Sequence, residues 1–196
     1  MARKVGLALD DVAQAAAAVA DRAGLDAVTL SAVADELGVR SPSLYAHVQG
    51  LEGLRRLLGR YAAGRLAAQL TRAAARHEGR EALSAIAHAY RRFARRHPGW
   101  YDATQRAVPP GEDDALYAAL AACVAPVFSA LAQAGVGEAD RVHLTRAFRA
   151  ALHGFVSLEQ GRGFGMPESV EQSFLRLVQL LLDGVTIVTQ SPAKPA

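Results

Sequence analysis

Apolar residues recur every three or four positions along most of the chain, which is the spacing of one face of an α-helix. In residues 10–23, for example, Val12, Ala16 and Val19 fall on one face, and Gly24 follows as a stop signal. No pair of strand-like segments joined by a hairpin signal is found. The pattern therefore predicts an all-α protein of about nine helices.

The segments that carry this helical pattern are residues 10–23, 29–37, 41–48, 51–76, 80–97, 100–107, 112–134, 140–160 and 167–189. Pro126 lies inside the seventh segment, where it predicts a kink. The three short helices at the start predict a helix-turn-helix domain at residues 1–50. The long fourth helix joins it to a helical bundle at residues 51–190, and residues 191–196 are expected to be a disordered tail.

The segment at residues 29–48, TLSAVADELGVRSPSLYAHV, has the pattern of two short helices joined by a tight turn. Thr29 is placed to cap the first helix, and Gly38 permits the left-handed backbone of the turn. Ser41 then caps the second helix, with Pro42 at its first position, where the missing N–H costs nothing. A second helix that presents its N-terminal residues in this way fits the major groove of DNA.

The residues of this motif that are expected to face outward are candidates for DNA contacts. Arg40 and Ser43 can reach base edges or phosphates, and Tyr45 and His47 can donate hydrogen bonds to phosphates. The full candidate set is Thr29, Arg40, Ser41, Pro42, Ser43, Tyr45, His47 and Arg55. One alternative is that the two helices only cover a core and bind nothing. For the arginines, the alternative is a solvent-exposed helix face without a DNA contact.

Composition narrows the class of protein without choosing a partner. The 196 residues are 51% apolar and 21% charged, which suits a folded globular protein. The net charge of +3 is weak evidence for nucleic acid. The N-terminus does not have the pattern of a signal peptide, and no segment approaches the roughly 20 apolar residues of a membrane span. We therefore expect a cytoplasmic protein without a membrane partner.

No constellation of catalytic or metal-binding residues stands out in the sequence. The histidines show no paired ligand spacing, and the single cysteine, Cys123, lies in an apolar run where a buried, inert thiol is expected. The sequence contains no nucleophile elbow, P-loop or dinucleotide fingerprint. We expect no enzyme activity, no metal and no cofactor.

Residues 29–48 resemble the DNA-binding domain of TetR/AcrR-family transcriptional regulators through the pattern T-L-x-x-V-A-x-x-L-G-V-x-x-P-S-L-Y-x-H-V. The resemblance assigns the recognition-helix roles of the family to Ser41, Pro42, Ser43, Leu44, Tyr45 and His47. Many members place a phosphate-binding Lys shortly after the His. Here that position is Leu51, and Arg55 is the expected substitute.

Residues 151–165, ALHGFVSLEQGRGFG, resemble a subgroup of the family with a Trp- or Leu-His-Gly signature in its C-terminal domain. The resemblance implies that residues 51–190 bind a small apolar effector and form a homodimer through residues 140–160 and 167–189. The candidate effector contacts are Phe93, Trp100, Tyr101, Phe128, Phe148 and His153. An aromatic set with few polar tips suits an apolar ligand, but each residue can equally be a packing residue of the core.

These features predict a ligand-responsive transcriptional regulator, expected to be a repressor. A dimer would bind a palindromic operator in double-stranded DNA, and a small effector would release it. Two alternatives remain open. A nonspecific or architectural DNA-binding protein would use the arginines without reading bases. A helical enzyme or carrier would use a cavity in the C-terminal bundle.

Overall fold

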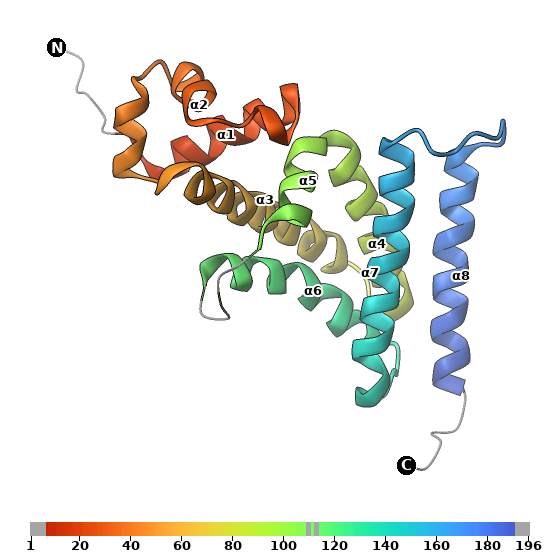
Figure 1. Ribbon diagram of the computed structural model, residues 1–196. Coiled ribbons are helices and arrows are strands. Elements are labelled where there is room, and N and C mark those ends of the chain that lie inside the picture. The colour runs from red at the N-terminus through yellow and green to blue at the C-terminus, as the bar shows by residue number, and fades with distance from the viewer. Residues whose placement is uncertain (1–6, 109–110, 112–113, 191–196) are drawn as a thin grey trace. The chain divides into compact units, whose positions relative to one another are not determined.

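The computed structural model describes residues 7–108, 111 and 114–190, and in this part of the chain every regular element is helical (Figure 1). The elements are α1 (Leu9–Ala23), η1 (Leu25–Ala27), α2 (Leu30–Leu37), η2 (Ser41–Ala46), α3 (Gly50–Ala74), α4 (Gly79–Arg96), α5 (Pro98–Arg106), α6 (Ala115–Gln133), α7 (Glu138–Gln160) and α8 (Val170–Gln190). The prediction of an all-α fold is confirmed. The predicted tail at residues 191–196 lies outside the described residues.

Two of the short elements differ from the predicted helices. The second helix of the predicted motif is the 3-10 helix η2, which is shorter than the predicted segment 41–48. The predicted Ser41 cap is wrong: Arg40 stands at the N-cap position without a side-chain cap hydrogen bond, and Pro42 is the second helical residue. Its turns close through Ser43 N–H to Arg40 O and His47 N–H to Leu44 O, both 2.9 Å. Pro42 provides no backbone donor, and short segments often adopt this tighter helix. The other 3-10 helix, η1, was not predicted from the sequence.

The chain forms two compact units, and both are discontinuous in sequence. The first unit contains residues 1–65 and 97–121, and the second contains residues 66–96 and 122–196. Helix α5 and the start of α6 therefore pack with the N-terminal helices, although they follow α4 in sequence. The functional division at residue 50 stays a prediction, because compactness does not say which residues bind DNA or effector.

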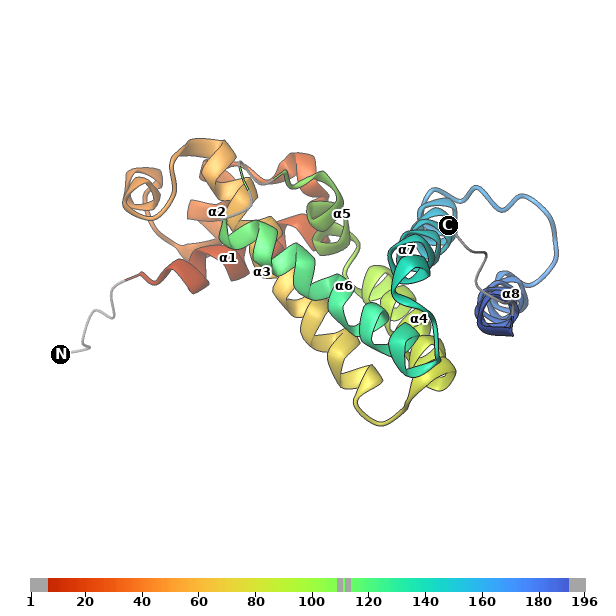
Figure 2. The ribbon, with the colours of Figure 1, turned by 90° about the horizontal axis from the view of Figure 1, so that it is seen from below.

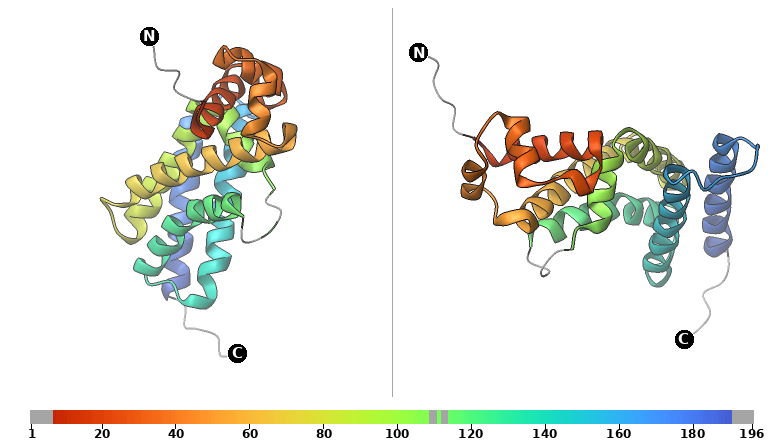
Figure 3. Two further views of the ribbon diagram at one scale, coloured as in Figure 1. Left: turned by 90° about the vertical axis from the view of Figure 1, so that its left-hand side faces the viewer. Right: turned by 45° about the horizontal axis from the view of Figure 1, so that its top comes forward.

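In the first unit, α1 packs against both α2 and α5. Figure 3 shows α5, in light green, beside one end of α1, in red. The apolar faces of these helices meet in one core, and its fully buried members include Val12, Val28, Val33, Leu44, Leu54 and Leu58. Because this core includes residues of η2 and α3, it fixes the position of the segment predicted to read DNA.

In the second unit, α4 packs against α7 and α8. Helices α7 and α8 run side by side in opposite directions, as Figure 1 shows lengthwise and Figure 2 end-on. Their buried residues include Phe148, Leu152, Phe174 and Val178. Each helix also has large apolar side chains on its exposed side, so the pair has an apolar surface that this unit does not cover.

Helix α6 is more apolar than the sequence analysis recognised. It is 19 residues long with a mean hydropathy of 2.0, which is enough by length and composition alone to cross a membrane. That finding is weak evidence, since the core helices of other folds pass the same test. The helix remains α-helical on both sides of Pro126, whose ring is buried.

Candidate nucleic-acid interface

The turn between α2 and η2 is formed by a cap at one end of α2 and a glycine at the other. Thr29 Oγ1 accepts a hydrogen bond of 3.1 Å from Ala32 N–H and so caps the start of α2. Gly38 ends the helix with φ 66° and ψ 30°, a left-handed backbone that favours glycine. Val39 N–H then donates to Ala34 O at 3.0 Å, which closes the turn. These local bonds set the direction in which the chain enters η2.

Helix η2 is anchored by one side chain and leaves its other residues outside the core. Leu44 is fully buried, and Val48, just beyond the helix, is almost so. Tyr45, by contrast, is 62% exposed. The DNA-contact candidates Thr29, Arg40, Pro42 and Ser43 are exposed, and Ser41 and His47 are half-buried. The predicted DNA-contact residues of this motif are therefore at least partly accessible.

The two arginines at the start of α3 have different surroundings. Arg55 is exposed and lines a hollow of about 120 Å³ together with Asp26 and Arg106. Arg56 Nη2 instead donates to Asp114 Oδ2 at 2.5 Å, so its charge is partly neutralised within the unit. The sequence predicted a phosphate contact for Arg55 and no role for Arg56. The difference comes from Asp114, which lies 58 residues along the chain from Arg56 and pairs with it.

An acidic side chain of α1 holds the start of α5. Asp21 Oδ1 accepts hydrogen bonds from the backbone N–H groups of Gly99 and Trp100, at 3.0 and 3.3 Å. Asp21 Oδ2 lies 2.8 Å from His97 Nδ1, and the His97 ring stacks on Trp100 with centroids 4.1 Å apart. Trp100 Nε1 also donates to Ala17 O at 3.0 Å. The sequence contained no signal for this contact, because Asp21 resembles an ordinary exposed residue near a helix end.

The six predicted effector contacts are divided between the two units. Trp100 and Tyr101 belong to the first unit, where Trp100 makes the contacts just described. The second unit contains Phe93, Phe128, Phe148 and His153. Phe93 and Phe148 are buried, whereas Phe128 and His153 are half-buried. The second unit therefore brings four of these residues into one body.

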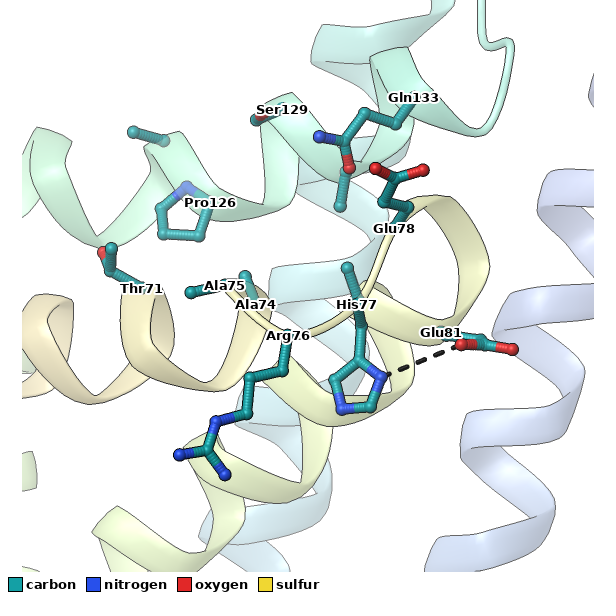
Figure 4. Close-up of a pocket in the computed structure, with 13 residues that line it drawn as sticks. Thr71, Ala74, Ala75, Arg76, His77, Glu78, Glu81, Pro126, Ser129 and Gln133 are labelled. Atoms are coloured by element: carbon teal, nitrogen blue, oxygen red, sulfur yellow. Dashed lines mark ion pairs between the residues drawn. The ribbon is translucent and has the colours of Figure 1, made fainter.

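A groove of about 870 Å³ lies between the end of α3, the start of α4 and the second half of α6 (Figure 4). In this view the ring of His77 points toward Glu81, with Nδ1 3.7 Å from Oε2. On the opposite wall, Gln133 Oε1 accepts a hydrogen bond of 3.2 Å from Gly79 N–H. The groove has a mixed-charge polar lining and contains none of the predicted effector contacts.

A buried arginine links the three helices of the second unit. Arg91 on α4 donates twice to Glu159 on α7, at 2.7 and 3.0 Å, and once to Glu171 on α8, at 2.7 Å. Its guanidinium also lies 4.5 Å from the centroid of Phe174. The hydrogen bonds from Arg91 lower the pKa of the Glu159 carboxyl below its ordinary value.

The described residues offer little for other chemistry. Among residues 7–108, 111 and 114–190, no cluster of three His, Cys, Asp or Glu side chains is placed to hold a metal ion. Burial raises the pKa of the Cys123 thiol to about 11, so the thiol stays protonated at neutral pH. The raised pKa agrees with the inert thiol expected from the sequence, although Cys123 is half-buried rather than fully buried.

Comparison with known proteins matches the N-terminal and the C-terminal parts of the chain to models of the same family. Residues 12–56 match the family model described as bacterial regulatory proteins of the tetR family. Residues 83–181 match the model described as a tetracyclin repressor-like C-terminal domain. The first match covers the turn and η2, and the second runs from within α4 through α5, α6 and α7 into the first half of α8.

Individual relatives support the match. The chain is 38% identical over 160 residues to the HTH-type transcriptional regulator Rv0681 of Mycobacterium tuberculosis, covering 81% of this chain and 73% of that protein. It is 29% identical over 187 residues to YobS of Bacillus subtilis, also an HTH-type transcriptional regulator, covering 95% and 97% of the two chains. Among solved structures, Streptomyces coelicolor ActR in complex with (S)-DNPA shares the fold, with a TM-score of 0.67 and 17% identity over 95% of this chain and 99% of that one.

Proposed function

Because the chain belongs to the TetR family of transcriptional regulators and carries its DNA-binding helix-turn-helix, we propose that it is a ligand-responsive repressor. A homodimer binds a palindromic operator in the cytoplasm, and a small effector lowers its affinity for that operator. The members it matches are transcriptional regulators, and we propose no enzyme activity for the chain.

One observation carries the DNA-reading part of the proposal: Leu44 is buried while Tyr45, its neighbour, is 62% exposed. A fixed backbone with an outward-facing N-terminal edge is what base readout in the major groove requires. Arg40 and Ser43 on this edge supply donors for bases or phosphates, and Tyr45 and His47 supply donors for phosphates. Arg55 adds a cation at the start of the next helix.

The homodimer is supported by apolar side chains on the exposed sides of α7 and α8. Leu158, Leu180 and Ile187 are 51%, 69% and 65% exposed, and Val142 and Leu175 are also exposed. A surface of this kind on a helix pair favours a partner, and a second copy can cover it with the same surface across a two-fold axis. A two-fold dimer would place two reader segments about 34–36 Å apart, one turn of DNA.

The decisive experiment for DNA reading is a binding selection from a random duplex pool, followed by affinity measurements on the selected sequence. We expect a palindromic site, and Tyr45→Ala to weaken binding to it by about tenfold through a lost phosphate contact. Tyr117→Ala removes another exposed tyrosine of the first unit and should bind as the unmodified protein does. Equal affinity for random DNA would instead favour the architectural alternative.

The dimer is tested separately. Leu180→Glu puts a charge on the exposed apolar surface of α8 and should give a monomer in sedimentation, with weakened operator binding. Val108→Glu changes a residue that is 76% exposed in the first unit and should leave the dimer intact. A Leu180→Glu protein that remains a dimer would show that this surface is not the interface.

A further inference from the structure

Two polar side chains of α7 lie one helical turn apart, and each has a buried atom that lacks a partner. Within the described residues, no group forms a hydrogen bond with Arg141 Nε or with Thr145 Oγ1. Thr145 is only 7% exposed, so its hydroxyl is largely shielded from bulk solvent. Residues four apart on a helix share a face. Two unsatisfied polar groups on one face indicate a common polar partner.

An aromatic ring from α6 lies beside these two polar side chains. The guanidinium of Arg141 lies 5.1 Å from the ring centroid of Phe128 on α6. The ring offers the cation a favourable face but takes no hydrogen bond from Nε. In the part of the chain that the structure describes, no carboxylate forms an ion pair with Arg141. The guanidinium beside this ring therefore has no carboxylate within ion-pair distance among the described residues.

Arg91 in the same unit shows what such a site looks like when it is complete. Its guanidinium also lies on an aromatic ring, that of Phe174, but it additionally donates to the carboxylates of Glu159 and Glu171. Arg141 has the ring without the carboxylate. The missing group is thus an oxyanion, and a carboxylate has the planar geometry that a guanidinium binds best.

Thr145 is a poor choice for the fold alone. A buried hydroxyl without a partner lowers stability, and valine would fill the same volume without that cost. Threonines inside helices usually satisfy the hydroxyl with the carbonyl four residues earlier, but no such bond is formed here. A buried hydroxyl that lowers stability and adds no packing beyond that of valine is best explained by a ligand.

We propose that Arg141, Thr145 and Phe128 anchor the small-molecule site of the second unit, and that its ligand is a compact carboxylate with an apolar body. The ligand carboxylate accepts hydrogen bonds from Arg141 Nε and from the Thr145 hydroxyl, and the apolar body packs on Phe128. The proposal rests on the proposed function, because it names the chemical class of the effector. It changes the expected apolar effector to one with a charged carboxylate end.

Direct calorimetric titration, in the absence of DNA, tests the site. The probes are benzoate, cinnamate and octanoate, each paired with its neutral amide. We expect at least one carboxylate to bind and its amide to bind at least tenfold more weakly, since only the anion completes the guanidinium. Arg141→Gln should weaken binding by tenfold or more and Thr145→Val by about fivefold. Arg146→Gln, at an exposed position of the same helix, should bind as the unmodified protein does.

Three results would overturn the proposal: no carboxylate binds at up to about 10 mM, the amides bind equally well, or Arg141→Gln has no effect. The melting temperature of Thr145→Val gives an independent readout. We expect it to rise, because the variant removes an unsatisfied hydroxyl, while carboxylate binding falls. A purely structural threonine would give a lower melting temperature, and that result would also contradict the proposal.

The site and the regulatory function fail in distinguishable ways. If carboxylates bind through Arg141 but operator affinity does not change, the site stands and the effector-responsive part of the proposed function is wrong. If a neutral compound releases the operator equally from the unmodified protein and from Arg141→Gln, the regulator stands and the carboxylate site is wrong.

Discussion

In both units a carboxylate joins helices that are distant in sequence, but the partners of that carboxylate differ. In the first unit, Asp21 accepts hydrogen bonds from the backbone at the start of α5, and Gly99 lets that backbone lie against α1. In the second unit, Glu159 and Glu171 meet the buried guanidinium of Arg91. The first contact depends on close approach and the second on a charge removed from water, so different changes should break them.

The largest effect is expected from removing the buried charge. Arg91→Ala leaves Glu159 without its partner and should lower the free energy of unfolding by about 3 kcal/mol. Denaturant unfolding followed by circular dichroism measures it. The exposed neighbour provides the control, and Arg92→Ala should stay within about 0.5 kcal/mol of the unmodified protein. If Arg91→Ala lowered the free energy of unfolding no more than Arg92→Ala, the buried charge would not be what holds the helices of the second unit together.

Close approach is tested at Gly99. A Cβ at this position would lie 2.2 Å from the backbone C and O of Ala20, so Gly99→Ala should cost about 2 kcal/mol through displacement of α5. Trp100, the only tryptophan, reports on the first unit by its fluorescence during unfolding. Gly64→Ala has open space around the added methyl and should stabilise α3 by about 0.5–1 kcal/mol. If Gly99→Ala and Gly64→Ala changed the free energy of unfolding in the same direction, the steric explanation would be wrong.

A smaller loss is expected from removing the acceptor at the start of α5. Asp21→Ala leaves the N–H groups of Gly99 and Trp100 without their partner and should cost about 1 kcal/mol. Asp21→Asn keeps an oxygen in place and should recover part of this loss, since a neutral cap can accept the same bonds. Asp35→Ala, at an exposed position of α2, is the control. If Asn is no better than Ala, the charge rather than the hydrogen bonds matters.

The smallest effect should appear as a pH dependence confined to the second unit. Hydrogen bonding to Arg91 lowers the pKa of Glu159 below the ordinary value of 4.5. Glu159 therefore contributes stability above that pH, and the contribution is lost as the pH falls through the lowered pKa. Melting temperatures between pH 3 and 7 should fall less steeply at the acid end for Glu159→Gln than for the unmodified protein. Parallel curves would show that Glu159 contributes nothing to the acid response.

The sequence predicted the helices well because their signals are local. The Thr29 cap and the Gly38 turn were read from residue type, and both form as expected. The type of the second helix was missed, because a 3-10 and an α-helix of six residues share the same start signals and the same buried anchor. The apolar character of α6 was also underestimated, since Pro126 and small residues disguise a long hydrophobic helix.

The sequence was less informative about which side chains meet. It grouped Trp100 and Tyr101 with the aromatic residues of the C-terminal bundle, whereas the structure places them in the first unit. It identified neither the Arg91 cluster nor the unsatisfied pair of Arg141 and Thr145, because exposed and buried arginines look alike in a helical pattern. The role of an arginine depends on its neighbours in space, which the sequence pattern does not give.

The sequence by itself determined where the helices lie, which turn separates α2 from η2, and which family motif the turn carries, since periodicity, caps and glycine act within a few residues. Only the tertiary structure decided which charges are paired. Arg91 meets carboxylates 68 and 80 residues away, while Arg141 meets a ring and no carboxylate in the described part of the chain. Coulomb and hydrogen-bond energies depend on distance in space, and helix packing sets that distance.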